Sequence, residues 1–203
     1  EYLKEIEQKV LEAKDYLDRR LQNKGQQKFA MVLDIDETSL SNYVPLKDHN
    51  FSTNMEAFSA SYLFNKLEAI GPVLGLFHYA KRRDVDVFFI TSRPNTPEVL
   101  AATVRNLKQV GYEGWKNLSL KPVQDDTLST ELYKQRVREE IIKEGYIIVL
   151  NVGDQLTDLS GGHAEVAIKL PNPFYMNTKI AAGWDLFFGR GSSPTVKRWV
   201  ERT

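Results

Sequence analysis

Short apolar runs alternate along this chain with longer segments of helical spacing, and the alternation restricts the possible folds more than any other feature. The apolar runs cover residues 29–34, 85–91, 117–120, 146–151 and 166–170. The segments of helical spacing cover residues 72–83, 97–110 and 130–144. Gly111 and Gly145 stand directly after two of these segments, where helices commonly end. The pattern predicts an α/β fold, a doubly wound, Rossmann-like parallel sheet with helices on both faces.

The first 22 residues predict one amphipathic helix that packs on the sheet domain. Apolar side chains recur there every three or four positions, at Leu3, Ile6, Val10, Ala13, Leu17 and Leu21. The same spacing over about three heptads also allows a short coiled-coil dimer. The oligomeric state is therefore left open, with a dimer as one possibility.

Residues 39–70 are too long for an ordinary connection between a strand and a helix, and we interpret them as an insertion. The segment is rich in rings: Tyr43, His49, Phe51, Phe58, Tyr62 and Phe64. It is expected to form a small cap over the strand ends that excludes water from a ligand. Whether His49 or any of the aromatic rings contacts the substrate stays open. We expect residues 1–203 to form a single domain that includes this cap.

Composition excludes several classes of protein. Lysine plus arginine and aspartate plus glutamate number 27 each, so no excess of positive charge predicts a nucleic-acid polymer as partner. The absence of cysteine excludes a thiol nucleophile, a disulfide scaffold and a thiolate zinc site. No apolar run approaches the roughly 18 residues of a transmembrane helix. The chain begins at Glu1 rather than methionine, and we expect that a preceding segment was removed.

Polar side chains gather directly after three of the predicted strands. Asp34 and Asp36 follow the first strand, and as residues i and i+2 of an extended segment they point the same way. The second strand ends in Thr91, Ser92 and Arg93, and the fourth is followed by Asp154 and Asp158. In a doubly wound sheet these strand ends meet at one edge, where ligands bind. Because crowded carboxylates tolerate each other when a cation neutralises them, and oxygen ligands suit Mg²⁺, the pattern favours a magnesium site.

Five motifs in this order resemble the haloacid dehalogenase (HAD) superfamily. They are D-I-D-E-T at 34–38, V-F-F-I-T-S-R at 87–93, Y-K-Q-R-V-R at 133–138, G-D-Q-L-T-D at 153–158 and K-L-P-N-P-F-Y at 169–175. More narrowly, the chain resembles the HAD acid phosphatases, which include the plant acid phosphatase and vegetative storage protein group and the bacterial class B and class C enzymes. The resemblance covers most of the chain and implies a HAD-like fold with a Mg²⁺-dependent phosphatase site.

The resemblance also implies roles for individual residues. Asp34 is implied as the nucleophile that forms an aspartyl-phosphate, and Asp36 as the general acid and base. Thr91 is implied as a catalytic ligand of a phosphoryl oxygen, and Thr38, Ser92 and Arg93 are further candidates for binding the phosphate.

The remaining implied roles concern the cation sites. Lys134 is implied as the catalytic lysine beside the phosphate, because its position 20 residues ahead of Asp154, followed by Arg138, matches the family pattern. A helix N-terminus adds positive charge there, and Lys121 is the alternative. Asp154 is implied to bind Mg²⁺ together with Asp34 and the backbone carbonyl of Asp36. Asp158 is implied either to hold the water ligands of the metal or to orient Lys134.

The sequence therefore predicts a Mg²⁺-dependent acid phosphatase that hydrolyses small organic phosphate monoesters. The alternatives are a HAD phosphotransferase or mutase and a non-catalytic storage or binding protein on the same scaffold. Export to the periplasm, the cell surface or the medium is favoured over the cytoplasm, since the similar bacterial enzymes are usually exported. The physiological substrate does not follow from the sequence.

Overall fold

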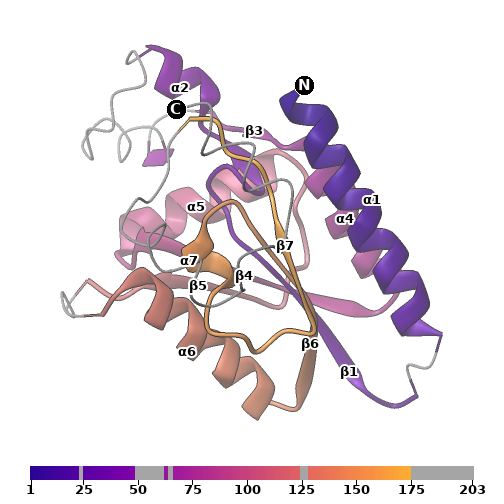
Figure 1. Cartoon of the computed structure of the whole chain (residues 1–203). Coiled ribbons are helices and arrows are strands. Elements are labelled where there is room, and N and C mark those ends of the chain that lie inside the picture. Colours follow the sequence, from indigo (N-terminus) through magenta and orange to yellow (C-terminus); the bar gives the residue numbers. More distant parts are fainter. Residues whose placement is uncertain (23–24, 49–61, 64–65, 124–127, 175–203) are drawn as a thin grey trace, which may run out of the picture.

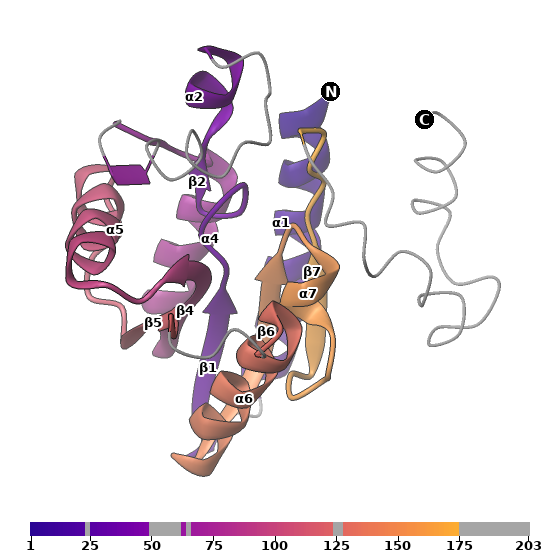
Figure 2. The same cartoon turned by 90° about the vertical axis from the view of Figure 1, so that its left-hand side faces the viewer.

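A five-stranded parallel sheet forms the centre of the molecule (Figures 1 and 2). The computed structural model describes residues 1–22, 25–48, 62–63, 66–123 and 128–174. The strands run in the order β5-β4-β1-β6-β7, so β1 lies in the middle. Their bounds are β1 (Lys28–Leu33), β4 (Val85–Pro94), β5 (Asn117–Lys121), β6 (Tyr146–Gly153) and β7 (Val166–Lys169).

The longer helices connect or cover these strands, as the alternating pattern predicts. Their bounds are α1 (Tyr2–Leu21), α4 (Gly71–Lys81), α5 (Pro97–Gln109) and α6 (Thr130–Lys143). Gly111 and Gly145 have φ angles of 101° and 89°, which places both in the left-handed region that ends helices α5 and α6. A short helix that the sequence pattern did not predict, α7 (Leu156–Leu159), follows β6.

Alternate side chains of the central strand enter two separate cores. Phe29, Met31 and Leu33 face a large core that also contains the apolar side chains of α1 and α4. Ala30 and Val32 face the opposite side, where the core includes apolar side chains of α6. Both faces of the sheet are therefore covered, which explains why the strands read as continuous apolar runs. The predicted fold class is confirmed.

Helix α1 packs on the domain through the middle of the stripe that its sequence predicts. Ile6, Val10, Ala13 and Leu17 are buried, but Leu3, the first member of the stripe, is more than half exposed because it lies in the first turn of the helix. The far end of the helix is tied to the sheet, because Arg20 and Tyr16 both contact the carboxylate of Glu165 just before β7. Among the described residues, no helix is both long enough and apolar enough to cross a lipid bilayer.

Two short strands join the ends of the predicted insertion. β2 (Leu40–Ser41) pairs antiparallel with β3 (Glu68–Ala69), and helix α2 (Tyr43–Asp48) follows β2. The segment therefore leaves and re-enters the domain at one place, beside the end of β1. His49, Phe51, Phe58 and Phe64 lie outside the described residues, while Tyr43 and Tyr62 are described.

Candidate active site

Asp34 and Asp36 lie in a tight turn directly after the central strand. The last residue of β1, Leu33, pairs with Phe89 on one side and Val152 on the other, and the Asp34 amide donates to the Val152 carbonyl at 3.0 Å. The carbonyl of Ile35 then accepts the amides of Ser39 and Leu40, both at 2.8 Å, and closes the turn. The two carboxylates are thereby held at the carboxyl edge of the sheet, where the sequence predicts them.

The turn requires a left-handed residue, and the chain places a glutamate there. Glu37 has a φ of 56° and is fully buried. Its carboxylate accepts the backbone amide of Asn42 at 2.6 Å and the Asn42 side chain at 3.2 Å. These bonds offset the cost of the left-handed conformation and fix the entry into α2.

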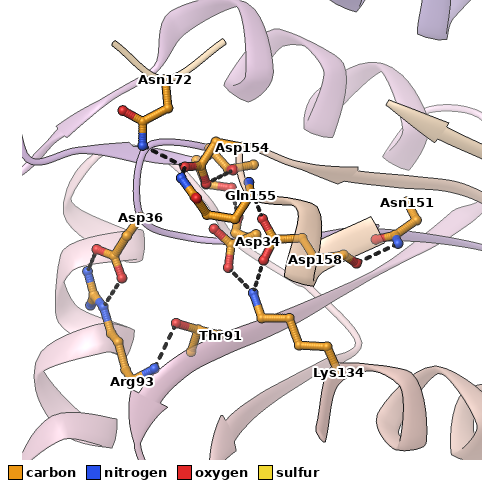
Figure 3. A network of polar contacts seen from close by, with 12 residues as sticks. Asp34, Asp36, Thr91, Arg93, Lys134, Asn151, Asp154, Gln155, Asp158 and Asn172 are labelled. Atoms are coloured by element: carbon orange, nitrogen blue, oxygen red, sulfur yellow. Dashed lines mark hydrogen bonds and ion pairs between the residues drawn. The ribbon is translucent and has the colours of Figure 1, made fainter. Parts of the chain in front are cut away.

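Three buried carboxylates lie close together, and two of them contact one ammonium group (Figure 3). Asp34, Asp154 and Asp158 each offer an oxygen, and these oxygens lie within 4.8 Å of one another. The Lys134 ammonium donates to Asp34 Oδ1 and, at 2.7 Å, to Asp158 Oδ1. Lys134 itself is only 2% exposed, so its charge acts on the carboxylates with little screening by water.

The crowding of these carboxylates alters their pKa values. Burial and the charge of Asp158 raise the pKa of Asp34 well above its usual value, although Lys134 opposes the shift. Burial and Asp158 likewise raise the pKa of Asp154 from 3.8 to about 6. The positive charge around Asp34 and Asp154 is therefore too small to offset burial and the repulsion between the carboxylates.

The donor set fits a hard divalent cation. It consists of carboxylate oxygens alone, which suit Mg²⁺ better than a softer metal. A bound cation would also relieve the repulsion that raises the pKa values of Asp34 and Asp154. The side-chain carboxylate of Asp36 is not in this group.

Asp154 is held in place by three side chains. Thr38 Oγ1 donates to Asp154 Oδ1 at 3.0 Å, and Gln155 and Asn172 donate to Asp154 Oδ2 at 2.6 and 2.7 Å. The hydroxyl of Thr38, which the sequence indicates as a candidate for binding the phosphate, therefore contacts the Asp154 carboxylate in this structure. Sequence reasoning missed Gln155 and Asn172, although both stand within the motifs that carry the family resemblance.

Asp158 reaches the site because α7 packs closely on the end of β6. Its Oδ2 accepts a hydrogen bond from the backbone N–H of Gln155 at 2.8 Å, as part of a capping box at the start of α7. The other oxygen, Oδ1, accepts from Lys134. A side chain at Gly153 would clash with Asp158, so the glycine permits this close approach. The Asp158 carbonyl accepts from Asn151 at 2.9 Å and from Arg138 at 2.8 Å.

The end of β4 carries the second predicted motif. Thr91 is buried and its Oγ1 accepts the Arg93 amide at 3.2 Å, while Ser92 is exposed. The pairing of β4 with β5 shifts register between Thr91 and Pro94. Such an irregularity redirects side chains at a strand end, and here the Arg93 side chain lies against Asp36 (Figure 3).

Arg93 forms a two-pronged ion pair with Asp36. Nε donates to Oδ2 at 2.9 Å and Nη2 donates to Oδ1 at 2.7 Å. Asn42 adds a third hydrogen bond to Oδ1 at 2.9 Å. Burial raises the pKa of Asp36, but Arg93 and Asn42 outweigh it and hold the pKa below its usual value.

Lys121, the alternative catalytic lysine, is the last residue of β5 and is partly exposed. It lies two strands away from β1, because β4 stands between β5 and β1.

Comparison with known proteins assigns this chain to one family. The family model described as HAD superfamily, subfamily IIIB (acid phosphatase), matches residues 1–178. The chain is 37% identical over 154 residues to a stem 28 kDa glycoprotein of Glycine max, a match that covers 73% of this chain and 60% of the relative. It is 33% identical over 150 residues to acid phosphatase 1 of Solanum lycopersicum, a match that covers 71% of this chain and 57% of that relative. It is 32% identical over 148 residues to vegetative storage protein 1 of Arabidopsis thaliana, a match that covers 71% of this chain and 54% of that relative.

The matches therefore span no more than about 60% of the length of these curated relatives. Among solved structures, the class C acid phosphatase from Bacillus anthracis superposes with a TM-score of 0.73 at 22% identity, covering 100% of this chain and 90% of that one. A similarity at that level of identity establishes that the two share a fold.

Proposed function

We propose that this chain, which belongs to subfamily IIIB (acid phosphatase) of the HAD superfamily, hydrolyses small organic phosphate monoesters in a Mg²⁺-dependent reaction. The observation that carries the proposal is the placement of Asp34. Its carboxylate lies at the carboxyl edge of the sheet, contacts the Lys134 ammonium and shares an oxygen-lined site with Asp154 and Asp158. Positioning and neutralisation of charge are the main requirements of phosphoryl transfer.

The metal would be held by Asp34 and Asp154 with the backbone carbonyl of Asp36. When bound, Mg²⁺ supplies positive charge that neutralises the phosphoryl oxygens. Asp158 is already engaged by Lys134 and by the Gln155 amide, which supports a role in orienting Lys134. We keep the contact of Asp158 with water ligands of the metal as its second role.

In the first step, an Asp34 carboxylate oxygen attacks phosphorus while the bond from phosphorus to the leaving oxygen breaks. Protonated Asp36 gives its proton to that oxygen, which departs as the alcohol. Arg93 lowers the pKa of Asp36, so the protonated form that this step needs becomes abundant only when the pH is acidic. This dependence supports an acidic pH optimum.

In the second step, a water molecule attacks phosphorus of the aspartyl-phosphate and the bond to Asp34 breaks. Ionised Asp36 accepts a proton from the water, so phosphate is released and both carboxyl groups return to their starting states. The ion pair with Arg93 stabilises the ionised form that this step needs. One residue thus acts as acid and then as base.

Thr91 and Lys134 are the proposed catalytic contacts of the phosphoryl oxygens. Thr91 is buried at the end of β4, and Lys134 is the cation in direct contact with the proposed nucleophile. Ser92 and Thr38 remain candidates for the phosphate; Thr38 would have to share its hydroxyl with Asp154. Lys121 has less support, because β5 is separated from β1 by β4.

Residues 39–70 are proposed to form the cap over this site. The antiparallel pairing of β2 with β3 beside the end of β1 supports this arrangement. A cap there would contact the leaving group and decide which small phosphate esters are accepted.

Export from the cytoplasm is proposed from the relatives. One of them is named the stem 28 kDa glycoprotein, and glycosylation is typical of exported chains. Fractionation of the source cells, with phosphatase activity followed in each fraction, tests this proposal. Activity confined to the cytoplasm would contradict it.

Release of p-nitrophenol from its phosphate ester between pH 4.5 and 8, in Mg²⁺ and then in EDTA, tests the proposed reaction. Turnover that peaks below neutral pH and disappears in EDTA is expected, with recovery when Mg²⁺ is added back. Transfer of phosphate to an added alcohol in preference to water would indicate a phosphotransferase or mutase. Folded protein with Mg²⁺ but without turnover would favour a storage or binding role, as the name of the Arabidopsis relative describes.

A further inference from the structure

The carboxylate of Asp36 is fixed from several sides by side chains that do not belong to the carboxylate cluster. Arg93 holds both of its oxygens, at 2.9 and 2.7 Å, and Asn42 holds Oδ1 at 2.9 Å. Arg93 and Asp36 are 2% and 7% exposed, so the pair is shielded from water. A paired guanidinium and carboxylate have one preferred planar geometry, which therefore determines where the Asp36 oxygens lie.

Arg93 is in turn held by helix α5 and by the 39–70 segment. Its Nη1 donates to Thr103 Oγ1 on α5 at 3.0 Å. Each of the three guanidinium nitrogens thus donates to a protein oxygen, so three of its five N–H donors are engaged by Asp36 and Thr103. On its flat face, the guanidinium carbon lies 4.6 Å from the centre of the Tyr62 ring.

Tyr62 is anchored independently of Arg93. Its backbone carbonyl accepts from Asn106 Nδ2 at 2.7 Å, and the next carbonyl, that of Leu63, accepts from Arg105 Nη2 at 2.7 Å. Tyr62 is 3% exposed, and Asn106 is 1% exposed. Two consecutive residues of the 39–70 segment are therefore fixed to α5, with the ring of the first placed over Arg93.

We propose that Arg93 is the positioning residue of Asp36, and that Tyr62 is the residue through which the 39–70 segment keeps Arg93 in place. The proposal rests on the proposed function, in which Asp36 moves the proton. It replaces the phosphate contact that the sequence suggested for Arg93. The 39–70 segment, which is proposed to contact the leaving group, would then also help to hold Asp36, the residue that protonates the leaving group.

The leaving group provides the readout that separates positioning from other roles. An alkyl oxygen leaves as a strong base and needs the proton of Asp36, whereas p-nitrophenolate is stable enough to leave with little help. Misplacement of Asp36 should therefore slow glycerol 2-phosphate far more than p-nitrophenyl phosphate. Binding of inorganic phosphate should not change, because Arg93 does not contact it in this proposal.

Arg93→Lys, Tyr62→Leu and Tyr62→Phe test the proposal in the full-length chain with Mg²⁺. The readout is kcat/KM, which reports the first step, because the second step needs Asp36 as a base for either ester and so contributes to kcat for both. For Arg93→Lys, kcat/KM for glycerol 2-phosphate should fall about 10- to 100-fold, while kcat/KM for p-nitrophenyl phosphate and inhibition by phosphate stay within about threefold. Tyr62→Leu should shift kcat/KM for glycerol 2-phosphate in the same direction by about threefold, and Tyr62→Phe, which keeps the ring, should match the wild type. Tyr62→Leu should add nothing to Arg93→Lys, because both act through one contact.

A second arginine offers a matched control far from the site. The Arg83 guanidinium carbon lies 3.6 Å from the centre of the Tyr79 ring, and its Nε donates to Asp18 at 3.1 Å. Arg83→Lys therefore alters an arginine that, like Arg93, contacts one tyrosine ring and one aspartate, here Tyr79 on α4 and Asp18 on α1. The ratio of kcat/KM values for the two esters should stay at the wild-type value.

Weaker inhibition by phosphate with an unchanged ratio of kcat/KM values would overturn the proposal and return Arg93 to the phosphate site. Equal losses of kcat/KM for both esters would likewise contradict it. Crystal structures of the wild type and Tyr62→Leu test the placement without turnover: a displaced Arg93 and Asp36 in the variant is expected, and an unmoved pair would refute the role of Tyr62. Failure of the proposed function would be recognised separately, as a wild type that hydrolyses neither ester in Mg²⁺.

Discussion

Arg138 on α6 donates from Nη1 to the backbone carbonyl of Asp158 on α7 at 2.8 Å. The same guanidinium donates to the carbonyls of Ser160 and, at 3.0 Å, Gly162. It is completely buried, and burial lowers its pKa to about 10. Arg138 therefore fixes the short helix that carries Asp158 through backbone groups alone.

Arg138→Lys should destabilise the protein, because one ammonium cannot reach three carbonyls and some would remain buried without a partner. We expect a loss of about 2–4 kcal/mol in the free energy of unfolding, measured by urea denaturation, together with a lower kcat. Arg136→Lys, an exposed position on the same helix, is the control and should change neither quantity. Equal stability of the Arg138 variant and the control would show that the three bonds are dispensable.

Asp34→Asn should abolish turnover, since an amide cannot form the aspartyl-phosphate. The fold should be retained, because burial penalises the charge that the substitution removes. Acid quenching after incubation with a labelled phosphate ester should trap a phosphorylated wild type and an unlabelled variant. Covalent label on the Asp34→Asn protein would rule out Asp34 as the nucleophile.

Lys134→Met should be strongly destabilising in EDTA, because Asp34 and Asp158 lose the cation that pairs with them. Removal of one partner of a buried ion pair costs about 3–5 kcal/mol, and Mg²⁺ should restore part of that loss. Thermal denaturation with and without Mg²⁺ measures both effects. Lys121→Met is the comparison and should have little effect; a larger loss of activity there would reverse the assignment of the catalytic lysine.

Asn172→Ala should weaken the affinity for Mg²⁺ about tenfold, because Asn172 holds the Asp154 oxygen that faces away from Thr38. Activity measured against Mg²⁺ concentration gives the affinity, and maximal activity at saturating Mg²⁺ should be less affected. Asn95→Ala, at an exposed position, serves as the control. An unchanged Mg²⁺ dependence in Asn172→Ala would separate this asparagine from the metal site.

Glu165→Gln should change how stability depends on pH. Burial raises the pKa of Glu165, but Arg20 and Tyr16 together outweigh burial and hold the pKa below 4.5, its usual value. A carboxylate with a lowered pKa stabilises the fold above that value, and this stabilisation is lost as the pH falls further. Melting temperatures should therefore differ most between wild type and variant above pH 4.5 and converge below it. A difference that grew on acidification would contradict this contact.

The sequence predicted the strands and the carboxylates well because both depend on local pattern. Each apolar run became a strand, with ends that moved by at most three residues. Asp34, Asp154 and Asp158 came together because parallel strands place their carboxyl ends at one edge. The motif at 133–138 likewise brought Lys134 into contact with Asp34.

The supporting contacts were beyond the sequence because they depend on tertiary packing. Nothing in the pattern of Arg93 indicates that its side chain lies on Asp36, since the direction follows from an irregularity in the pairing of β4 with β5. The four-residue helix α7 is too short for a periodic signal. Asn172 and Arg138 stand in recognised motifs, but their partners are Asp154 and a run of backbone carbonyls.

The order of strands in the sheet has a consequence for synthesis of the chain. Asp34 lies in the first fifth of the sequence, and the residues that complete its surroundings, Lys134, Asp154 and Asp158, follow 100 or more positions later. β1 can take its central place only when β6 has formed beside it. A nascent chain that ends before Asp158 therefore has no assembled carboxylate cluster, and the proposed reaction has to wait until that part of the chain has been made and folded.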